Sequence, residues 1–249
     1  MGKYRHDSVV PFRDSNATKK EQVASMFDQI AFRYDLLNRL LSGGLDVRWR
    51  KKAIAQLQKL HPERVLDVAT GTADVAIQMA RSLQPREIIG IDISEEMLEH
   101  GRKKIDKLLL TNIIRLEKGD SEAINHPSGT FDAVTVAFGV RNFENLETGL
   151  KEIHRVLRKG GKLVILEFSK PKLAWFGFIY NIYMKIITPR LGGLFSKNKD
   201  AYQYLHHSVK AFPEGETFLH ILDKTGFKET VLKRLTLGIC TIYCGIKSE

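Results

Sequence analysis

Two acidic residues stand at the ends of apolar segments, spaced as a nucleoside-binding site requires. Asp67 lies in the apolar run 64–68, and the turn Ala69-Thr70-Gly71-Thr72 follows it. A second apolar run, 88–92, ends in Asp92, 21 positions after Gly71. A carboxylate at the end of the second strand can accept hydrogen bonds from both ribose hydroxyls of a nucleoside. The pattern predicts a nucleoside-binding crevice at the carboxyl ends of parallel strands.

The turn after Asp67 limits which nucleoside can bind. Gly71 is its only glycine, so the turn is not G-x-G-x-x-G. A dinucleotide pyrophosphate needs several closely approaching backbone amides, and this turn is poorly built to supply them. S-adenosylmethionine has no phosphate and carries a cationic sulfonium, which suits one glycine with nearby acids. We therefore expect S-adenosylmethionine as the cofactor and methyl transfer as the reaction class.

Each cofactor-binding candidate has a structural alternative. Asp67 could accept from the cofactor's ammonium group or fix a loop amide, and Gly71 lets the backbone approach the ligand. Thr72 could contact the cofactor or cap the next helix, and Asp92 could instead cap the helix that begins near Ser94.

A third site for the cofactor is predicted at Gly119-Asp120-Ser121, where the third strand should end. Asp120 could accept from the adenine amino group while a backbone amide of the turn meets a ring nitrogen. An ordinary turn aspartate is the alternative.

The methyl acceptor should lie after the fourth strand, at Phe138-Gly-Val-Arg-Asn-Phe143. This stretch lacks the Asn/Asp-Pro-Pro-aromatic motif of many amino-methylating enzymes. Arg141 and Asn142 are suited to orienting an oxyanion or a water, and they are the predicted catalytic residues. Alternatively, Arg141 pairs with a nearby acid to hold the loop.

Alternating strand and helix patterns position these residues and predict an α/β fold with a mostly parallel, seven-stranded sheet. Strands are expected near 64–68, 87–92, 113–118, 131–137, 161–168, 227–235 and 238–247, and helices near 19–41, 46–60, 72–82, 94–109, 145–158 and 214–225. A terminal antiparallel strand pair is typical of the class I S-adenosylmethionine-dependent methyltransferases, a Rossmann-like arrangement. Lys159-Gly160-Gly161 is expected to cap the helix before the fifth strand.

One domain is predicted over residues 1–249. It divides into a flexible leader (1–18), N-terminal helices (19–61), a cofactor-binding core (62–171), a helical insertion facing substrate or membrane (172–210) and a C-terminal helix with a strand pair (211–249). The insertion is aromatic between Pro171 and Pro189 and fits an interfacial helix or a substrate lid, with core packing as the alternative.

Composition points to a basic protein of a reducing compartment. The net charge is +10, which favours an anionic partner, either nucleic acid or a membrane surface, although it could also serve solubility alone. The only cysteines, Cys240 and Cys244, are expected to be small buried apolar residues, and no zinc spacing or other metal site is present. Neither a signal peptide nor a membrane-spanning run occurs, so a cytoplasmic protein is expected.

Five separated motifs, in order, are similar to those of the quinone-biosynthesis C-methyltransferases, which include the demethylmenaquinone methyltransferases and their ubiquinone-pathway relatives. They are Tyr34-Asp-Leu-Leu-Asn-Arg-Leu-Leu-Ser-x-Gly44 through Trp49, Phe138-Gly-Val-Arg-Asn142, Arg155-Val-Leu-Arg-Lys-Gly-Gly161, Leu166-Glu-Phe-Ser-Lys-Pro171 and Tyr204-Leu…Ser208-Val…Phe212-Pro-x-Gly215. The resemblance runs from about Lys20 to the C-terminus. Ala73 departs from it, because the family usually has a second glycine there, and alanine fits if its backbone is helical.

The resemblance implies methyl transfer from S-adenosylmethionine to a ring carbon of a prenylated quinol, with Arg141 and Asn142 positioning a water. We favour demethylmenaquinol, and a methoxy-benzoquinol of the ubiquinone pathway, or both, is the alternative. Tyr34, His154 and the pair His206-His207 are weaker candidates for proton handling. Contact with an anionic membrane at the inner face of the cytoplasmic membrane is expected because the substrate carries a lipid tail.

Three other interpretations of the residues remain open. They are an RNA methyltransferase, which the basic charge suggests, a non-catalytic S-adenosylmethionine-binding protein, and a methyltransferase for a sterol or another phenol. The first needs basic residues around the crevice, where the insertion is aromatic and apolar, so no nucleic acid partner is predicted. The oligomeric state is left open, with a homodimer as one option.

Overall fold

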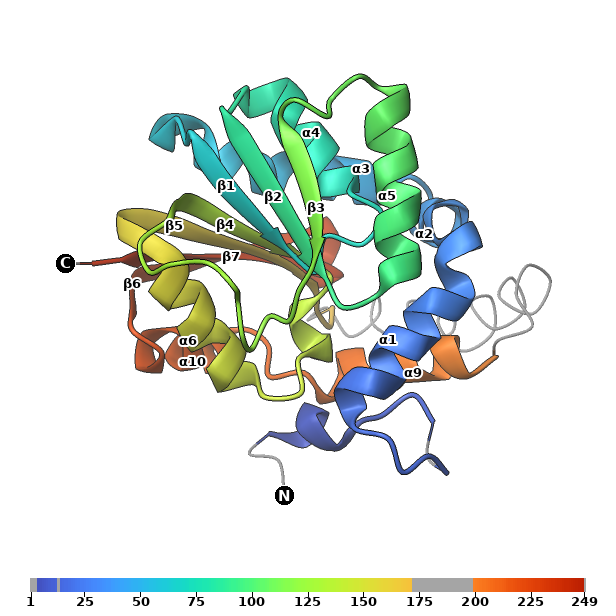
Figure 1. Cartoon of the computed structure of the whole chain (residues 1–249). Coiled ribbons are helices and arrows are strands. Elements are labelled where there is room, and N and C mark those ends of the chain that lie inside the picture. The colour runs from blue at the N-terminus through green and yellow to red at the C-terminus, as the bar shows by residue number, and fades with distance from the viewer. Residues whose placement is uncertain (1–3, 13, 172–198, 249) are drawn as a thin grey trace.

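A seven-stranded sheet with the order β3-β2-β1-β4-β5-β7-β6 forms the centre of the described structure (Figure 1). The computed structural model describes residues 4–12, 14–171 and 199–248. The strands are β1 Arg64–Val68, β2 Glu87–Asp92, β3 Ile114–Lys118, β4 Phe131–Ala137, β5 Leu157–Phe168, β6 Phe227–Leu235 and β7 Cys240–Lys247. β1 to β5 pair in parallel, and β7 is antiparallel to both β5 and β6. The predicted α/β fold with a terminal antiparallel pair is confirmed.

Helices cover both faces of this sheet (Figure 1). The α-helices are α1 Lys19–Ile30, α2 Tyr34–Ser42, α3 Leu45–Ile54, α4 Asp74–Leu83, α5 Glu95–Lys107, α6 Leu146–Val156, α9 Lys199–Ala211 and α10 Glu216–Lys224. Short 3-10 helices are η1 Arg5–Ser8, η2 Ala31–Arg33, η3 Ala55–Leu60, η4 Val140–Asn142 and η6 Thr236–Gly238. Among the described residues, none of the helices is long and apolar enough to cross a bilayer.

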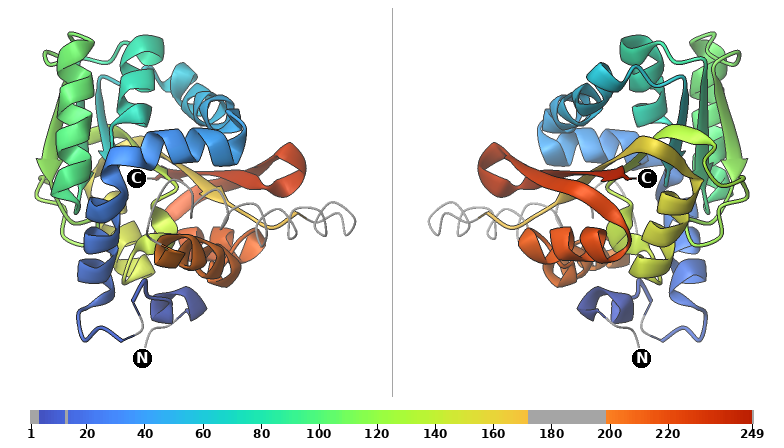
Figure 2. Two further views of the ribbon diagram at one scale, coloured as in Figure 1. Left: turned by 90° about the vertical axis from the view of Figure 1, so that its right-hand side faces the viewer. Right: turned by 90° about the vertical axis from the view of Figure 1, so that its left-hand side faces the viewer.

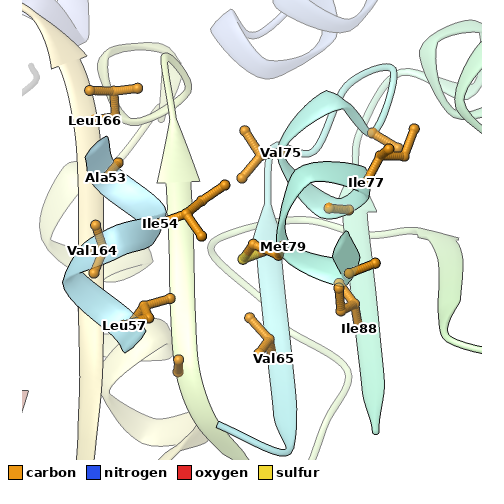
Figure 3. Packing of buried hydrophobic residues seen from close by; sticks show 14 of the residues in the cluster. Ala53, Ile54, Leu57, Val65, Val75, Ile77, Met79, Ile88, Val164 and Leu166 are labelled. Carbon is orange, nitrogen blue, oxygen red and sulfur yellow. The ribbon is translucent and has the colours of Figure 1, made fainter. Parts of the chain in front are cut away.

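Two apolar cores follow from the alternation of side chains along the strands. Val65 belongs to the core beneath α3, α4 and α5, and its neighbour Leu66 belongs to the core beneath α6 and α10. Figure 3 shows the first core, in which Met79 of α4 lies over Val65 of β1 and Leu57 of η3 lies toward Val164 of β5. Burying such side chains contributes about 1.5–3 kcal/mol each. Cys240 and Cys244 are buried free thiols, as predicted.

The chain reverses its direction of travel across the sheet between β1 and β4. From β1 the chain moves outward to β2 and β3, and then returns to add β4 on the other side of β1. The loops after the neighbouring strands β1 and β4 therefore lead away in different directions at the carboxyl edge of the sheet, where ligands of such folds bind. These loops also touch, because a Cβ at Gly139 would lie 2.5 Å from the Cβ of Ala69.

The N-terminal residues differ from the sequence prediction in two ways. The predicted helix 19–41 is divided into α1 and α2 by the 3-10 turn η2, at Ala31–Arg33. Residues 4–8 are not a flexible leader, since η1 packs on α9 (Figure 2). The His6 ring is fully buried against Phe212, and the Tyr4 hydroxyl donates to the carboxylate of Glu147 at a distance of 2.5 Å. Aromatic burial offsets the entropy cost of ordering this segment.

Other boundaries shift at helix ends. The second predicted helix, 46–60, ends as α3 at Ile54 and continues as the tighter η3. The helix predicted over 145–158 ends at Val156, and Lys159-Gly160-Gly161 is not its cap but lies in the first part of β5. Residues 172–198 of the predicted insertion lie outside the described part of the chain. Its last part is α9, which packs on α1 through Tyr204, Val23 and Met26.

The close contact of the two loops predicts the effect of one methyl group. We expect Gly139→Ala to lower the free energy of unfolding by about 1–3 kcal/mol, because neither backbone carries a flexible side chain that can move aside. Ala69→Gly in the same chain should recover most of this loss, since it removes the opposing methyl. Urea unfolding of the two single variants and the double variant measures the coupling, and additive effects would contradict the packing argument.

Candidate active site

Two adjoining cavities lie at the carboxyl ends of the strands. The first has a volume of about 60 Å³ and the second of about 430 Å³. Phe27, Tyr34 and Phe138 line both, so these three aromatic side chains form the boundary between the cavities. The first is built from α1 and the loops after β1, β2, β3 and β4. The second is built from α1, α2, α3, α9 and the ends of β4 and β5.

Asp92 lines the first cavity at the end of β2. Its carboxylate accepts hydrogen bonds from the amide of Gly71 at 2.8 Å and from the amide of Ser94 at 3.0 Å. Burial raises the pKa of Asp92 despite these hydrogen bonds, which act to lower it. Ser94, and not Asp92, is the N-cap of α5, since its hydroxyl accepts from the amide of Met97. Asp92 is therefore a carboxylate held at the cavity by the backbone.

The turn after β1 has a left-handed backbone at three positions, Ala69 with a φ of 54°, Gly71 and Ala73. Gly71 has a φ of 55° and lines the first cavity, and a side chain there would be strained. Ala73 has a φ of 64° and is itself the N-cap position of α4. The condition under which alanine would fit without strain, a helical backbone, is therefore not met, and this residue carries a strain that glycine would lack. It also follows that Thr72 does not cap α4.

Thr72 instead connects the turn to the N-terminal helices. Its hydroxyl donates to Asp35 of α2 at 2.6 Å and accepts from Lys104 of α5 at 3.0 Å. Lys104 also donates to Asp35 and to Asp74. Thr72 is buried and is absent from the lining of both cavities, so the observed role of its side chain is to hold α2 and α5 against the turn.

Asp67 lies beneath the turn. Its two oxygens accept hydroxyl hydrogen bonds from Thr70 at 2.7 Å and from Thr135 of β4 at 2.6 Å. It is fully buried and lines neither cavity. Burial raises the pKa of Asp67 to about 6, although both hydroxyls act to lower it. The carboxylate holds the turn in place through the Thr70 side chain. The spacing of residues in the sequence does not distinguish this structural role from contact with a cofactor.

Asp120 and Ser121 line the opposite side of the first cavity, after β3. Asp120 accepts from the amide of Glu122 and from the ammonium of Lys20, which comes from α1. Burial acts to lower the pKa of Lys20, but the hydrogen bond to Asp120 and the nearby acids raise it above its usual value. Sequence analysis missed Lys20, because a lysine at the start of a helix carries no signal of a contact 100 positions away.

Arg141 lies at the second cavity. One of its nitrogens, Nη1, donates to Glu167 of β5 at 2.8 Å and to the carbonyl of Phe138. The Arg141 side chain is buried, and its Nε has no hydrogen-bond partner among the described residues. The ion pair with an acid, predicted as the alternative role of Arg141, is therefore observed. In addition, Nε of this residue is a buried donor without a partner among the described residues. An unsatisfied buried N–H costs about 1–3 kcal/mol.

Asn142 joins the two cavities. It lines the first, and its side-chain oxygen accepts at 3.1 Å from the hydroxyl of Tyr204, which lines the second. Burial raises the pKa of both Tyr34 and Tyr204, and nearby Arg141 only partly opposes this. Both phenols are therefore protonated at neutral pH, and the Tyr204 hydroxyl donates to Asn142. Tyr204 and Glu167 lie within two of the matched motifs, but no role was predicted for either.

The histidines considered for proton handling lie elsewhere. His154 of α6 packs edge-on against the ring of Phe227, and burial lowers its pKa. His206 and His207 contact one another on α9. None of the three lines either cavity. Among the described residues no cluster of three or more His, Cys, Asp and Glu side chains is placed to hold a metal ion.

Comparison with known proteins matches residues 15–247 to the ubiE/COQ5 methyltransferase family. The chain belongs to this family. Its relatives include a demethylmenaquinone methyltransferase of Bacteroides fragilis, 45% identical over 98% of this chain and 99% of the relative. A ubiquinone/menaquinone biosynthesis C-methyltransferase of Geobacter sulfurreducens is 46% identical over 92% of this chain and 90% of the relative.

Solved structures show the same fold at low sequence identity. The [4+2]-cyclase SpnF has a TM-score of 0.68 and 17% identity, and covers 92% of this chain and 96% of its own. A methyltransferase of Thermotoga maritima, described as S-adenosylmethionine-dependent and as a possible histamine N-methyltransferase, has a TM-score of 0.62 and 20% identity, covering 90% and 99%. The family member described here therefore has the class I methyltransferase fold.

The buried carboxyl of Asp67 predicts a pH-dependent stability. Its pKa is about 6 in the folded protein, against an ordinary value of 3.8 for an aspartate in an unfolded chain, so the folded state holds the proton more tightly. Stability from this group is present at low pH and is lost as pH rises from about 4 to about 6, with a total of about 3 kcal/mol.

Asp67→Asn removes the titrating group and retains an oxygen acceptor. The difference in unfolding free energy, wild type minus variant, should therefore fall by about 3 kcal/mol between pH 4 and pH 7. Urea titrations of both proteins at several pH values measure this difference. A difference that stays constant with pH would show that Asp67 titrates normally.

Proposed function

We propose that this protein transfers a methyl group from S-adenosylmethionine to a ring carbon of a prenylated quinol, converting demethylmenaquinol to menaquinol. The names of relatives at 45% identity over nearly the whole chain support this substrate. The observation that carries the proposal is the buried Nε of Arg141, a donor without a partner among the described residues, beside a mostly apolar cavity of about 430 Å³. That cavity adjoins the crevice proposed for the cofactor.

The residues of the first cavity fit S-adenosylmethionine. The Asp92 carboxylate is held in place by two amides and still faces the cavity, where a pair of ribose hydroxyls could donate to it. Asp120 and Ser121 border the side where the adenine would lie, with Ile93 and Met97 as apolar neighbours. The cavity, with a volume of about 60 Å³, is smaller than an adenosyl group, and Lys20 of α1 donates to Asp120 in its lining, so we propose that α1 shifts when the cofactor enters.

Arg141 is proposed to stabilise the phenolate of the quinol. A phenol has a pKa of about 10, and ionisation of its hydroxyl makes the adjacent ring carbon electron-rich. Bound S-adenosylmethionine supplies an electrophilic methyl group on a sulfonium. An arginine remains protonated at neutral pH, so Nε of Arg141 acts as a donor to the oxyanion and not as a base. Glu167 on Nη1 fixes the orientation of the guanidinium.

Asn142 and Tyr204 are proposed to position the ring or a water at the boundary between the cavities. The Tyr204 hydroxyl occupies the side-chain oxygen of Asn142, which leaves the Asn142 amide group to donate. Tyr34 and Phe138 border both cavities, and their rings would exclude bulk water from the methyl-transfer position. A dry, aligned pocket supplies much of the acceleration for a reaction between two bound molecules.

The second cavity suits a lipid-substituted ring. Its lining from α1 and α2 includes Met26, Ile30, Leu37, Leu40 and Leu41. Burying a prenyl chain against these side chains contributes about 25 cal/mol per Å² of apolar surface. We further propose a cytoplasmic enzyme that meets its substrate at the inner face of the membrane. A methoxy-benzoquinol of the ubiquinone pathway is the second candidate, because relatives at 46% identity are named for both pathways.

Asp92→Asn tests the cofactor site. The amide nitrogen cannot accept from a second ribose hydroxyl, so we expect S-adenosylmethionine affinity to fall about tenfold or more, the loss of one charge-assisted hydrogen bond. Isothermal titration with S-adenosylhomocysteine measures binding without turnover. Glu95→Gln, an exposed change on α5 outside the cavity lining, is the control and should bind normally. Unchanged affinity in the Asp92 variant would remove Asp92 from the cofactor site.

Methyl transfer with labelled S-adenosylmethionine tests the substrate. We expect product from reduced demethylmenaquinone, and product from the demethylated methoxy-benzoquinol alone would move the enzyme to the ubiquinone pathway. Absence of product from both quinols, with cofactor binding intact, would overturn the proposal and favour a phenolic substrate, RNA or a non-catalytic binding role.

Arg141→Lys tests the phenolate contact. The lysine keeps a charge for Glu167 but loses the Nε donor, so kcat should fall about 100-fold while S-adenosylhomocysteine binding is kept. Arg155→Lys is the matched control, because Arg155 is also ion-paired, to Glu152, but lies on α6 away from both cavities. Equal activity of the two variants would exclude Arg141 from catalysis.

A further inference from the structure

Three large apolar side chains are exposed along one stretch of the N-terminal helices. Phe32 of η2 is 79% exposed, and Leu36 and Leu40 of α2 are 53% and 43% exposed. Leu36 and Leu40 are four residues apart and lie on one side of α2, and Phe32 precedes that helix in η2, where its ring lies 6.3 Å from the ring of His100 of α5. We name Phe32, Leu36 and Leu40 the α2 stripe. α1 and α2 run along the side of the molecule that faces the viewer in the left view of Figure 2.

The α2 stripe is continuous with the second cavity. Leu40 lines that cavity and is also exposed, so it stands at the edge between them. Leu37 and Leu41, on the other side of the same helix, line the cavity. α2 therefore separates the second cavity, which is mostly apolar, from the outer surface, and it has apolar side chains on both of these faces. Exposed apolar side chains next to an apolar cavity are typical of a surface that binds a partner and not of one that contacts only water.

The surroundings of the stripe are basic. Arg33 of η2 and Arg39 of α2, which is 3.8 Å from Asp46, are exposed, and α3, which is in contact with α2, carries the exposed bases Arg48, Lys51 and Lys52. Between residues 31 and 60 the only acids are Asp35 and Asp46, and both are held by bases: Asp35 by Lys104, and Asp46 by Arg50. Residues 31–60 thus carry a net positive charge, which suits an anionic partner, whereas α5, which packs on η2, presents the exposed acids Glu96 and Glu99 together with the exposed base Lys103.

We propose that the α2 stripe and its basic surroundings dock on the surface of an anionic lipid bilayer, with Leu40 at the point where a lipid tail passes between the bilayer and the cavity. Only the tail passage rests on the proposed function; the docking itself does not. A second copy of the chain would also cover an apolar stripe, but two copies of one basic surface would repel each other. Exposed apolar side chains on a basic helical segment are the chemistry of an interfacial helix.

Vesicle sedimentation tests the docking with the intact protein. The wild type should bind phosphatidylglycerol vesicles, bind phosphatidylcholine vesicles weakly, and lose binding as salt increases. Phe32→Ser and Leu36→Ser, which lie outside both cavities, should each weaken binding about tenfold to a hundredfold. Arg48→Glu should weaken binding to phosphatidylglycerol by more than about fivefold, since about 1 kcal/mol is gained per basic residue at such a surface.

Val231→Ser is the matched control, because Val231 is 57% exposed but lies on β6 at the edge of the sheet. It should bind vesicles as the wild type does. Equal binding by the wild type, Phe32→Ser and Leu36→Ser would overturn the proposal. A second result would also overturn it: sedimentation velocity shows a dimer for the wild type and monomers for the two variants, while vesicle binding is unchanged.

Substrate length separates this proposal from the proposed function. Phe32→Ser and Leu36→Ser should methylate a short-tailed quinol in solution at the wild-type rate, and a long-tailed quinol in vesicles about tenfold or more slowly. Equal losses on both substrates would place the defect inside the protein and overturn the docking role. If no quinol is methylated by the wild type, the vesicle-binding results still decide whether the α2 stripe docks.

Discussion

The reversal of strand order between β1 and β4 is the constraint on which the site depends. It separates two loops at the carboxyl edge of the sheet, and the close approach of Gly139 to Ala69 fixes how far apart they stand. The loop after β1 supplies Gly71 to the first cavity, and the loop after β4 supplies Arg141 to the second. A ligand that donates a group and a ligand that receives it can therefore lie side by side without any further domain.

Buried charge gives these loops their geometry. Glu167 at the end of β5 holds Arg141, and hydroxyls from Thr70 and Thr135 hold Asp67. Burial of a charge is costly unless it is paired or hydrogen-bonded, so each carboxylate dictates where its partners stand. The incomplete case is Arg141, whose Nε is buried without a partner among the described residues, and we propose this atom as a donor for a developing oxyanion.

The N-terminal helices complete the site, although they precede the sheet in the sequence. Thr72 and Lys104 bind Asp35 of α2, Lys20 of α1 reaches Asp120, and Tyr34 borders both cavities. These contacts couple the position of α1 and α2 to the cofactor crevice on one side. On the other side, α2 carries the exposed stripe that we propose to meet the bilayer. One short helix thus connects the crevice, the apolar cavity and the outer surface.

The sequence by itself determined the order of strands and helices, the class of fold, the family and the residues Gly71, Asp92, Asp120 and Asn142 that border the first cavity. These follow from local periodicity and from turns at strand ends, which are properties of short segments. Only the tertiary structure decided that Asp67 faces two threonines, that Ala73 is left-handed, that residues 4–8 are packed, and that Lys20, Tyr204 and Glu167 belong to the site. The contacts of Asp67 with Thr135, of Lys20 with Asp120, of Tyr204 with Asn142 and of Glu167 with Arg141 join residues distant in the chain. Such side-chain packing, unlike periodicity, is not encoded within any one segment.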